Sequence, residues 1–153
     1  MVKIEGEILI DRPVDVVFDY VADQSNEPEY NPSMVRAEKI TSGPLGTGTR
    51  FRSAVATFRH HEAEMLIECT GYDRPNWVTT LTTMPQADFT YRLTFEPAAA
   101  GTRMHWSGSV RPKGAFRLVG PVFSLMGVRQ EKRIWASLKR HLESQTVDRP
   151  DQE

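Results

Sequence analysis

One tyrosine combines useful chemistry with a position expected to be internal. Tyr91 lies between Phe89 and Phe95, where apolar and polar residues alternate, and it shares the parity of the apolar side chains. A period of two is typical of a strand with one buried face, so we expect the Tyr91 hydroxyl to point inward. A buried phenol needs a hydrogen-bond partner and can act in acid–base catalysis. Tyr91 is therefore the single catalytic candidate and the only hydrogen-bonding group that we expect among the inward-facing strand residues.

A cluster of metal-binding residue types occurs at His60, Glu62 and Glu64. On a strand these three would share a face, but it is the polar face, opposite to Met65. No second ligand pair with zinc-like spacing occurs elsewhere in the sequence. We therefore expect a solvated strand end here, with no metal site and no cofactor.

Two further motifs have structural explanations. Gly43, Gly46 and Gly48 follow a GxxGxG spacing, no lysine follows them, and the segment leads into a strand, so a hairpin turn is favoured over a phosphate loop. Cys69 shares the parity of Met65 and should behave as a small buried hydrophobe. No GxSxG motif supplies a serine nucleophile.

The remaining candidates are apolar and aromatic side chains on the expected inward faces. Each fits an ordinary core position when considered separately. Together they fit the wall of a ligand cavity, because buried tyrosine and tryptophan need polar partners that a cavity supplies. With Tyr91, the predicted ligand-binding residues are Tyr30, Phe51, Val55, Met65, Ile67, Trp77, Leu81, Leu93, Met104, Trp106, Phe116, Phe123 and Met126.

The spacing of apolar residues predicts the strands and helices that position these side chains. Residues 2–10 predict a strand, and the apolar stripe over 14–21 predicts an amphipathic helix. Residues 22–32 predict a short broken helix or structured loop. Six alternating segments between residues 34 and 110, separated by short Gly- and Pro-containing turns, predict an antiparallel meander. A stripe with helical spacing from 116 to 142 predicts a lead-in to residue 120, a break at Gly120–Pro121 and a long helix to about residue 144.

The long C-terminal helix is the one element large enough to cover the apolar face of the sheet. The predicted fold class is therefore α+β, with a curved antiparallel sheet of six to seven strands wrapped around that helix. Residues 1–145 should form one ligand-binding domain, and 146–153 a polar tail. The basic residues from Arg129 to Arg140, interleaved with Glu131 and Glu143, should form the solvated face of the helix.

Composition excludes several classes of protein. The 153 residues carry a formal net charge of −1, which gives no electrostatic case for binding nucleic acid or an anionic membrane surface. A single cysteine cannot form an internal disulfide, which fits a reducing compartment. No segment approaches the ~18–20 apolar residues that span a bilayer, so no integral membrane contact is expected. We predict a cytoplasmic protein.

Two segments resemble a known superfamily. The stretch from Ile10 to Asp23, followed by Glu29-Tyr30-Asn31-Pro32, resembles the start of the START/birch-allergen-like (SRPBCC) superfamily. The segment Gly43–Phe51 resembles its bacterial polyketide cyclase/dehydrase-like branch. The resemblance covers roughly residues 3 to 144 and implies a helix-grip fold with an apolar cavity. It identifies neither a ligand nor a reaction.

Three functional hypotheses follow. The favoured one is binding of an apolar small molecule, such as a polyketide, aromatic, lipid or isoprenoid compound, between the sheet and the helix. The first alternative is a cyclase, aromatase or dehydratase that shapes a polyketide-like substrate and excludes water. The second is a module that binds a protein partner. Binding is favoured because no pair of titratable groups falls clearly on the predicted inner face.

Overall fold

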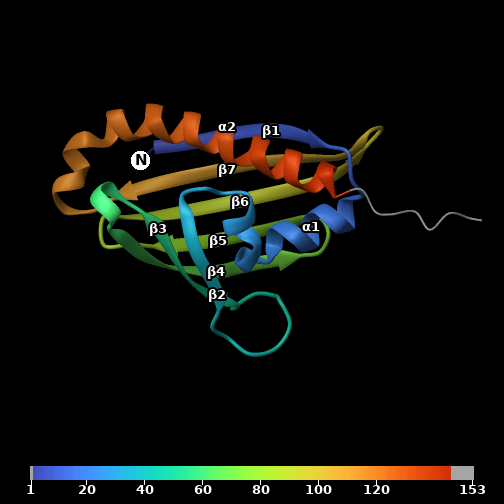
Figure 1. Cartoon of the computed structure of the whole chain (residues 1–153), viewed down its shortest axis with the longest axis horizontal. Helices are drawn as coiled ribbons and strands as arrows, with labels where there is room; N and C mark the ends of the chain where they lie inside the picture. The colour runs from blue at the N-terminus through green and yellow to red at the C-terminus, as the bar shows by residue number, and fades with distance from the viewer. Residues whose placement is uncertain (1, 146–153) are drawn as a thin grey trace, which may run out of the picture.

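The fold is built on a seven-stranded antiparallel sheet. The computed structural model describes residues 2–145; the side chains of residues 2, 58, 116 and 119–128 lie outside the described part. The order across the sheet is β1-β7-β6-β5-β4-β3-β2, so the N-terminal strand pairs with the last one (Figure 1). The strands are β1 (Val2–Ile10), β2 (Met34–Lys39), β3 (Arg50–Ala56), β4 (Glu62–Asp73), β5 (Trp77–Thr83), β6 (Ala87–Ala98) and β7 (Gly101–Pro112).

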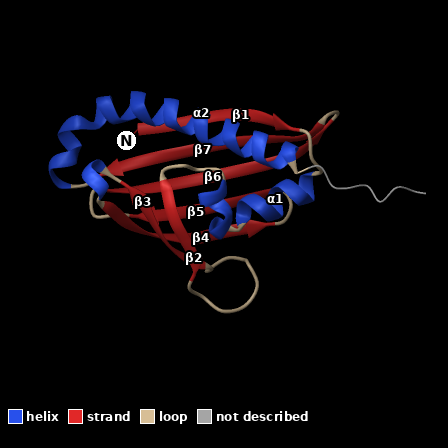
Figure 2. Cartoon of the chain, in the orientation of Figure 1, coloured by secondary structure: helices blue, strands red, loops and turns tan. Residues whose placement is uncertain are grey.

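The helices gather on one face of this sheet, which we call the inner face (Figure 2). The two α-helices are α1 (Val14–Ala22) and α2 (Gly120–Ser144), and the 3₁₀ turns are η1 (Gln24–Glu29), η2 (Phe58–His60) and η3 (Gly114–Val119). The predicted α+β helix-grip architecture is confirmed, including the start of a new helix at Gly120. Proline at the next position is suited to a first helical turn, where its missing N–H has no partner to lose.

The inner face carries two separate clusters of buried side chains. The larger one joins β1, β4–β7, α1 and α2; within it the Phe18 ring meets Tyr72 and Phe95 edge-on at 5.3 and 5.1 Å. The smaller one contains Met34, Phe51 and Ile67 of β2, β3 and β4. Residues of both clusters border the space between the sheet and α2.

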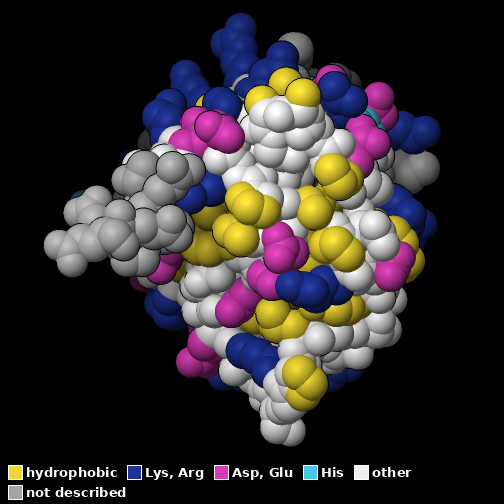
Figure 3. Space-filling view, turned by 90° about the vertical axis from the view of Figure 1, so that its right-hand side faces the viewer, with side chains coloured by type: hydrophobic (Ala, Val, Ile, Leu, Met, Phe, Trp, Pro, Cys, Tyr) yellow, Lys and Arg dark blue, Asp and Glu magenta, His cyan; other side chains and the backbone are white. Residues whose placement is uncertain are grey.

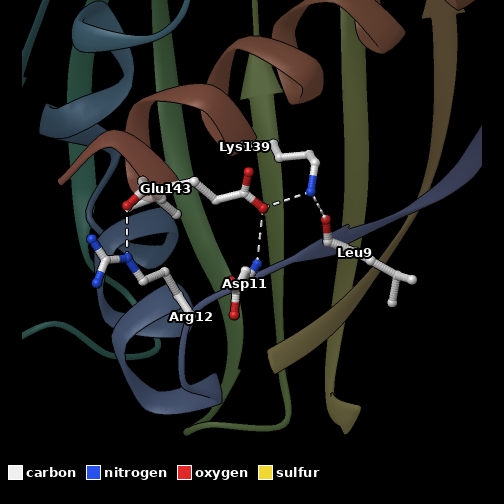
Figure 4. A network of polar contacts seen from close by, with 6 residues as sticks. Leu9, Asp11, Arg12, Lys139 and Glu143 are labelled. Carbon is white, nitrogen blue, oxygen red and sulfur yellow. Dashed lines mark hydrogen bonds and ion pairs between the residues drawn. The ribbon is translucent and has the colours of Figure 1, made fainter. Parts of the chain in front are cut away.

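A polar network fixes the C-terminal part of α2 against the end of β1 (Figure 4). Lys139 Nζ donates to the carbonyl oxygen of Leu9 at 2.7 Å and to Glu143 Oε1 at 2.6 Å. Glu143 Oε1 also accepts from the backbone N–H of Asp11 at 3.0 Å, while Arg12 Nε donates to the Leu142 carbonyl at 2.7 Å. These bonds set the position of the helix over the sheet.

The glycine motif lies in a turn and Glu62 and Glu64 lie on the surface, as predicted, but His60, which was expected on the same strand face, lies in η2 with φ of +63°. The Gly43–Gly48 segment lies in the β2–β3 connection, where Gly43 and Gly48 adopt φ of +86° and +93°, a conformation that favours glycine. Glu62 and Glu64 point away from the inner face and both pair with Arg36.

The end of the molecule that carries α1 has positive and negative side chains interspersed (Figure 3).

Candidate functional site

A cavity of about 780 Å³ occupies the space between the inner face of the sheet and α2. Met34 and Ile67 of the smaller cluster and Leu93 and Trp135 of the larger one all line it, so the cavity separates the two clusters. Most of its wall is apolar. This volume falls in the range of small-molecule sites, which are about 300–1,000 Å³.

On the α2 side, the cavity wall carries a carboxylate, Glu131, that accepts a hydrogen bond from Tyr91 of the sheet. The Tyr91 hydroxyl donates to Glu131 Oε1 at 2.6 Å, and Trp135 Nε1 donates to Glu131 Oε2 at 2.8 Å. All three residues line the cavity. Removal from water raises the pKa of Glu131, and the bonds from Tyr91 and Trp135 oppose that rise. The same burial, with the nearby Glu131 charge, raises the pKa of Tyr91 far above its usual range, so this phenol stays protonated.

A second carboxyl, Glu27, enters the same cavity from η1. Asn31 Nδ2 donates to Glu27 Oε1 at 2.9 Å. Removal from water raises the pKa of Glu27 to about 7; the Asn31 bond opposes this rise and the charge of Glu131 adds to it. At neutral pH this carboxyl therefore exchanges a proton readily, a property suited to acid–base chemistry.

Glycine makes room for the rings beside the cavity. Tyr91 pairs across the sheet with Gly108, and a Cβ at Gly108 would lie 2.8 Å from Cε1 of the Tyr91 ring. Trp106 pairs in the same way with Gly6, where a Cβ would lie 2.4 Å from its Cζ2. The Trp106 ring in turn lies against Trp135, with centroids 5.8 Å apart and the ring planes tilted by 34°. These glycines allow large rings to lie flat against the sheet.

The structure brings some of the predicted ligand-binding residues together around the cavity. Five members line the cavity: Val55, Met65, Ile67, Tyr91 and Leu93. Four others are buried on the inner side in the core clusters that support the wall: Tyr30, Phe51, Met104 and Trp106. The side chains of Phe116, Phe123 and Met126 lie outside the described residues.

The inward direction predicted for Trp77 and Leu81 is wrong. On β5 it is Val78, Thr80 and Thr82 that are buried, and both threonines line the cavity. Trp77 lies on the opposite face, with the guanidinium carbon of Arg92 4.7 Å from its ring centroid. Arg92 over the ring stabilises this half-buried tryptophan. Gly71 leaves room for it, since a Cβ at Gly71 would lie 2.7 Å from the ring. Leu81 pairs with Glu68 and Thr90 on the same outer face.

The expectation that no pair of titratable groups would fall on the inner face is also wrong, because Glu27, Tyr91 and Glu131 all line the cavity. Glu131 was predicted to lie on the solvated face of the helix, yet it contacts Tyr91 across the cavity. A helical signal for it exists, because Glu131 lies three and four residues before the buried Ile134 and Trp135. Glu27 lies in a short 3₁₀ turn, where the sequence has no period that shows which side chains point inward.

The other described residues of the cavity wall are neutral. The Gln86 Oε1 atom is buried and has no hydrogen-bond partner among the described residues. In the part of the chain that the structure describes, no group of three His, Cys, Asp or Glu side chains is arranged to hold a metal ion. Within residues 2–145, no helix is long and apolar enough to cross a membrane.

Solved structures share this architecture at low sequence identity. A START superfamily protein from Mycobacterium smegmatis superposes with a TM-score of 0.79 at 12% identity, over 95% of this chain and 100% of that one. Ara h 8.0201 gives 0.72 at 17%, over 93% and 97%. The di-domain ARO/CYC BexL from the BE-7585A biosynthetic pathway gives 0.69 at 19%, over 94% of this chain and 47% of that one. These likenesses show a common fold.

A search of curated proteins found no match. The family model described as "Polyketide cyclase / dehydrase and lipid transport" matches residues 1–143, nearly the whole chain. The resemblance seen in the sequence is therefore confirmed: the chain belongs to the polyketide cyclase/dehydrase and lipid transport family.

Proposed function

We propose that the protein binds a predominantly apolar small molecule, such as a polyketide, aromatic, lipid or isoprenoid compound, in the cavity between the sheet and α2. The observation that carries the proposal is the 780 Å³ cavity with a largely apolar wall. Apolar area removed from water contributes about 25 cal/mol per Å², so a ligand burying ~300 Å² gains several kcal/mol before entropy costs. That gain supports affinities in the micromolar range.

A neutral fluorescent probe, N-phenyl-1-naphthylamine, tests this function. We expect its emission to rise on mixing, with a micromolar Kd, and the melting temperature to rise with probe concentration. Ala63 lines the cavity, so Ala63→Phe should fill part of it and weaken binding about tenfold or more. Thr90→Phe, at an exposed position of β6, is the matched control and should bind as the wild type does. Equal affinity in both variants would place the probe outside the cavity and contradict the proposal.

Acid–base catalysis is the second candidate, and Glu27 is the observation that favours it. A carboxyl whose pKa is raised to about 7 can both accept and donate a proton at neutral pH. In a dehydration of a β-hydroxy ketone, Glu27 would take the proton from the carbon between the carbonyl and the carbinol. It would then deliver that proton to the departing hydroxide, which leaves as water.

Mass spectrometry of the protein incubated with β-hydroxy ketone or poly-β-ketone compounds tests the enzyme hypothesis. A product that forms faster with the wild type than with Glu27→Gln establishes catalysis. Binding without a protein-dependent product leaves binding as the function. Tyr91→Phe separates the two roles further, because loss of the hydroxyl should change ligand selectivity in a binder and abolish turnover in an enzyme that uses this phenol.

A further inference from the structure

The charges inside the cavity have one sign. Glu27 of η1 and Glu131 of α2 both line it, and no lysine, arginine or histidine is among the described residues that do so. The segment 119–128, whose side chains are outside the described part, contains no ionisable residue. The cavity is therefore acidic, although the whole chain has a formal net charge of only −1.

Among the described residues, only neutral groups donate hydrogen bonds to these carboxyls. Glu131 receives the Tyr91 hydroxyl and the Trp135 indole N–H, and Glu27 receives the Asn31 amide. No cation is among the groups that shift the pKa of either carboxyl. Two carboxylates near each other in a cavity of low polarity are unfavourable unless a positive charge joins them.

The rest of the wall suits a cation with an apolar body. The rings of Phe89, Tyr91 and Trp135 line the cavity, and aromatic faces attract ammonium groups. The Gln86 Oε1 atom adds a buried acceptor that receives no hydrogen bond from the described residues. A carboxylate or phosphate headgroup would find two negative charges in the cavity and, among the described lining residues, no basic partner.

We propose that the cavity selects apolar ligands that carry a protonated amine, and that Glu27 and Glu131 provide this selectivity. The inference rests on the proposed function, since it requires that an apolar ligand occupy the cavity. It adds the chemical class of the polar group that the ligand carries.

Binding of such a ligand is coupled to proton release. The titratable groups that face Glu27 are Glu131 from α2, Tyr91 from β6 and Tyr30 beside η1. Both phenols stay protonated, because burial raises the pKa of each far above its usual range. A bound ammonium group favours ionised Glu27, so the affinity for the amine should rise as the pH increases through about 7. The affinity for a neutral ligand of the same shape should not rise with pH.

Three compounds with one skeleton test the proposal: 2-(2-naphthyl)ethylamine, 2-(2-naphthyl)ethanol and 2-naphthylacetate. Calorimetric titrations at pH 5.5 and pH 8 should show the amine binding about tenfold or more tighter than the alcohol at pH 8, with the carboxylate weakest. The preference for the amine should shrink at pH 5.5. Titrations in buffers of different ionisation enthalpy should show proton release for the amine alone.

Matched variants assign the selectivity to the carboxyls. Glu27→Gln should bring the amine and the alcohol within about threefold of each other and remove the pH dependence, and Glu131→Gln should act in the same direction. Glu7→Gln, at an exposed position of β1, is the control and should keep the wild-type preference. Glu27→Gln alone suffices as a test if Glu131→Gln does not fold.

The outcomes separate the two proposals. If the alcohol binds as tightly as the amine at pH 8, amine selectivity is overturned while apolar binding stands. If the full preference survives in Glu27→Gln, the assignment of the selectivity to this carboxyl is overturned. If none of the three compounds binds while N-phenyl-1-naphthylamine does, amine selectivity alone is overturned. If that probe does not bind either, the binding function itself is overturned, and the selectivity with it.

Discussion

The Tyr91 hydroxyl donates a 2.6 Å hydrogen bond to Glu131 Oε1, joining the middle of the sheet to α2 across the cavity. The two residues are 40 positions apart in the sequence, and the bond connects the two walls between which a ligand would lie. Trp135, one helical turn further along α2, holds the other carboxylate oxygen. Glu131 is therefore fixed in orientation by groups from both walls.

Tyr91 and Glu131 should be energetically coupled. Tyr91→Phe leaves the half-buried Glu131 carboxylate with one donor fewer. Hydrogen bonds to charged groups contribute about 1.5–3 kcal/mol to the free energy of unfolding. Urea unfolding of Tyr91→Phe, Glu131→Leu and the double variant should give a coupling energy of about 1 kcal/mol or more. The control is Thr90→Val, which removes an exposed hydroxyl bonded to Ser109 Oγ and should cost less than about 0.5 kcal/mol. Additive single effects would show that the hydrogen bond contributes nothing.

Glu27→Gln should stabilise the protein at high pH and not at low pH. The pKa of Glu27 is raised from 4.5 to about 7 in the folded state, so between these values the folded protein keeps a proton that the unfolded chain has released. The stabilisation that the raised pKa of Glu27 provides is fully present below about pH 4.5 and is lost as the pH rises to 7 and above. Glutamine, which resembles the neutral acid, avoids that loss and should raise the free energy of unfolding by about 1–3 kcal/mol at pH 8.

Chemical denaturation at pH 4.5 and pH 8 measures this difference. Glu7→Gln provides the comparison, because Glu7 is exposed on β1. A stability gain of the same size at both pH values would mean that Glu27 ionises as freely in the folded protein as in the unfolded chain.

Much of the fold could be predicted because its strands and helices bury one face each. The alternation from Phe89 to Phe95 and the stripe ending at Leu142 each indicate the type of element and its buried side. The buried face of β5 could not be predicted in this way, since each face carries apolar residues: Trp77 and Leu81 lie on one and Val78 on the other, and the remaining residues are threonines. Threonine is favoured in strands on either face, so composition did not indicate which face of β5 is buried.

The inward position of Glu131 was not predicted either. A charged residue in a helix usually faces water, and Glu131 was assigned accordingly although it continues the stripe of Ile134, Leu138 and Leu142. Its burial depends on donors from Tyr91, 40 residues away, and from Trp135. Contacts between distant residues of this kind leave no local pattern in the sequence.

Ligand binding should be sensed by Trp135 and not by Trp77. Trp135 lines the cavity, whereas Trp77 lies on the outer face against Arg92. Addition of n-decanol, which does not absorb near 280 nm, should change the tryptophan emission of the wild type and of Trp77→Phe. Trp135→Phe should lose most of the change. If the emission change disappears in Trp77→Phe and persists in Trp135→Phe, the ligand lies on the outer face of the sheet and not in the cavity.

Gly108→Ala should destabilise the protein and displace Tyr91. The new Cβ would lie 2.8 Å from Cε1 of the Tyr91 ring, closer than side chains tolerate, so the ring must move and its bond to Glu131 must lengthen. Overpacking of this kind lowers the free energy of unfolding by about 1–3 kcal/mol. Gly46→Ala is the matched control, because a Cβ there meets no atom within 4 Å. Its stability should stay within about 0.5 kcal/mol of the wild type.

A second substitution shows whether the loss in Gly108→Ala arises from the Tyr91 ring. In a Tyr91→Leu background the leucine can rotate away from the added methyl, so the same glycine substitution should cost less than it does beside tyrosine. Affinity for the neutral naphthyl alcohol should fall in Gly108→Ala as well, since the displaced ring enters the cavity that Tyr91 lines. If Gly108→Ala unfolds at the same urea concentration as Gly46→Ala and binds the alcohol equally well, the ring is mobile enough to yield, and Gly108 does not position Tyr91.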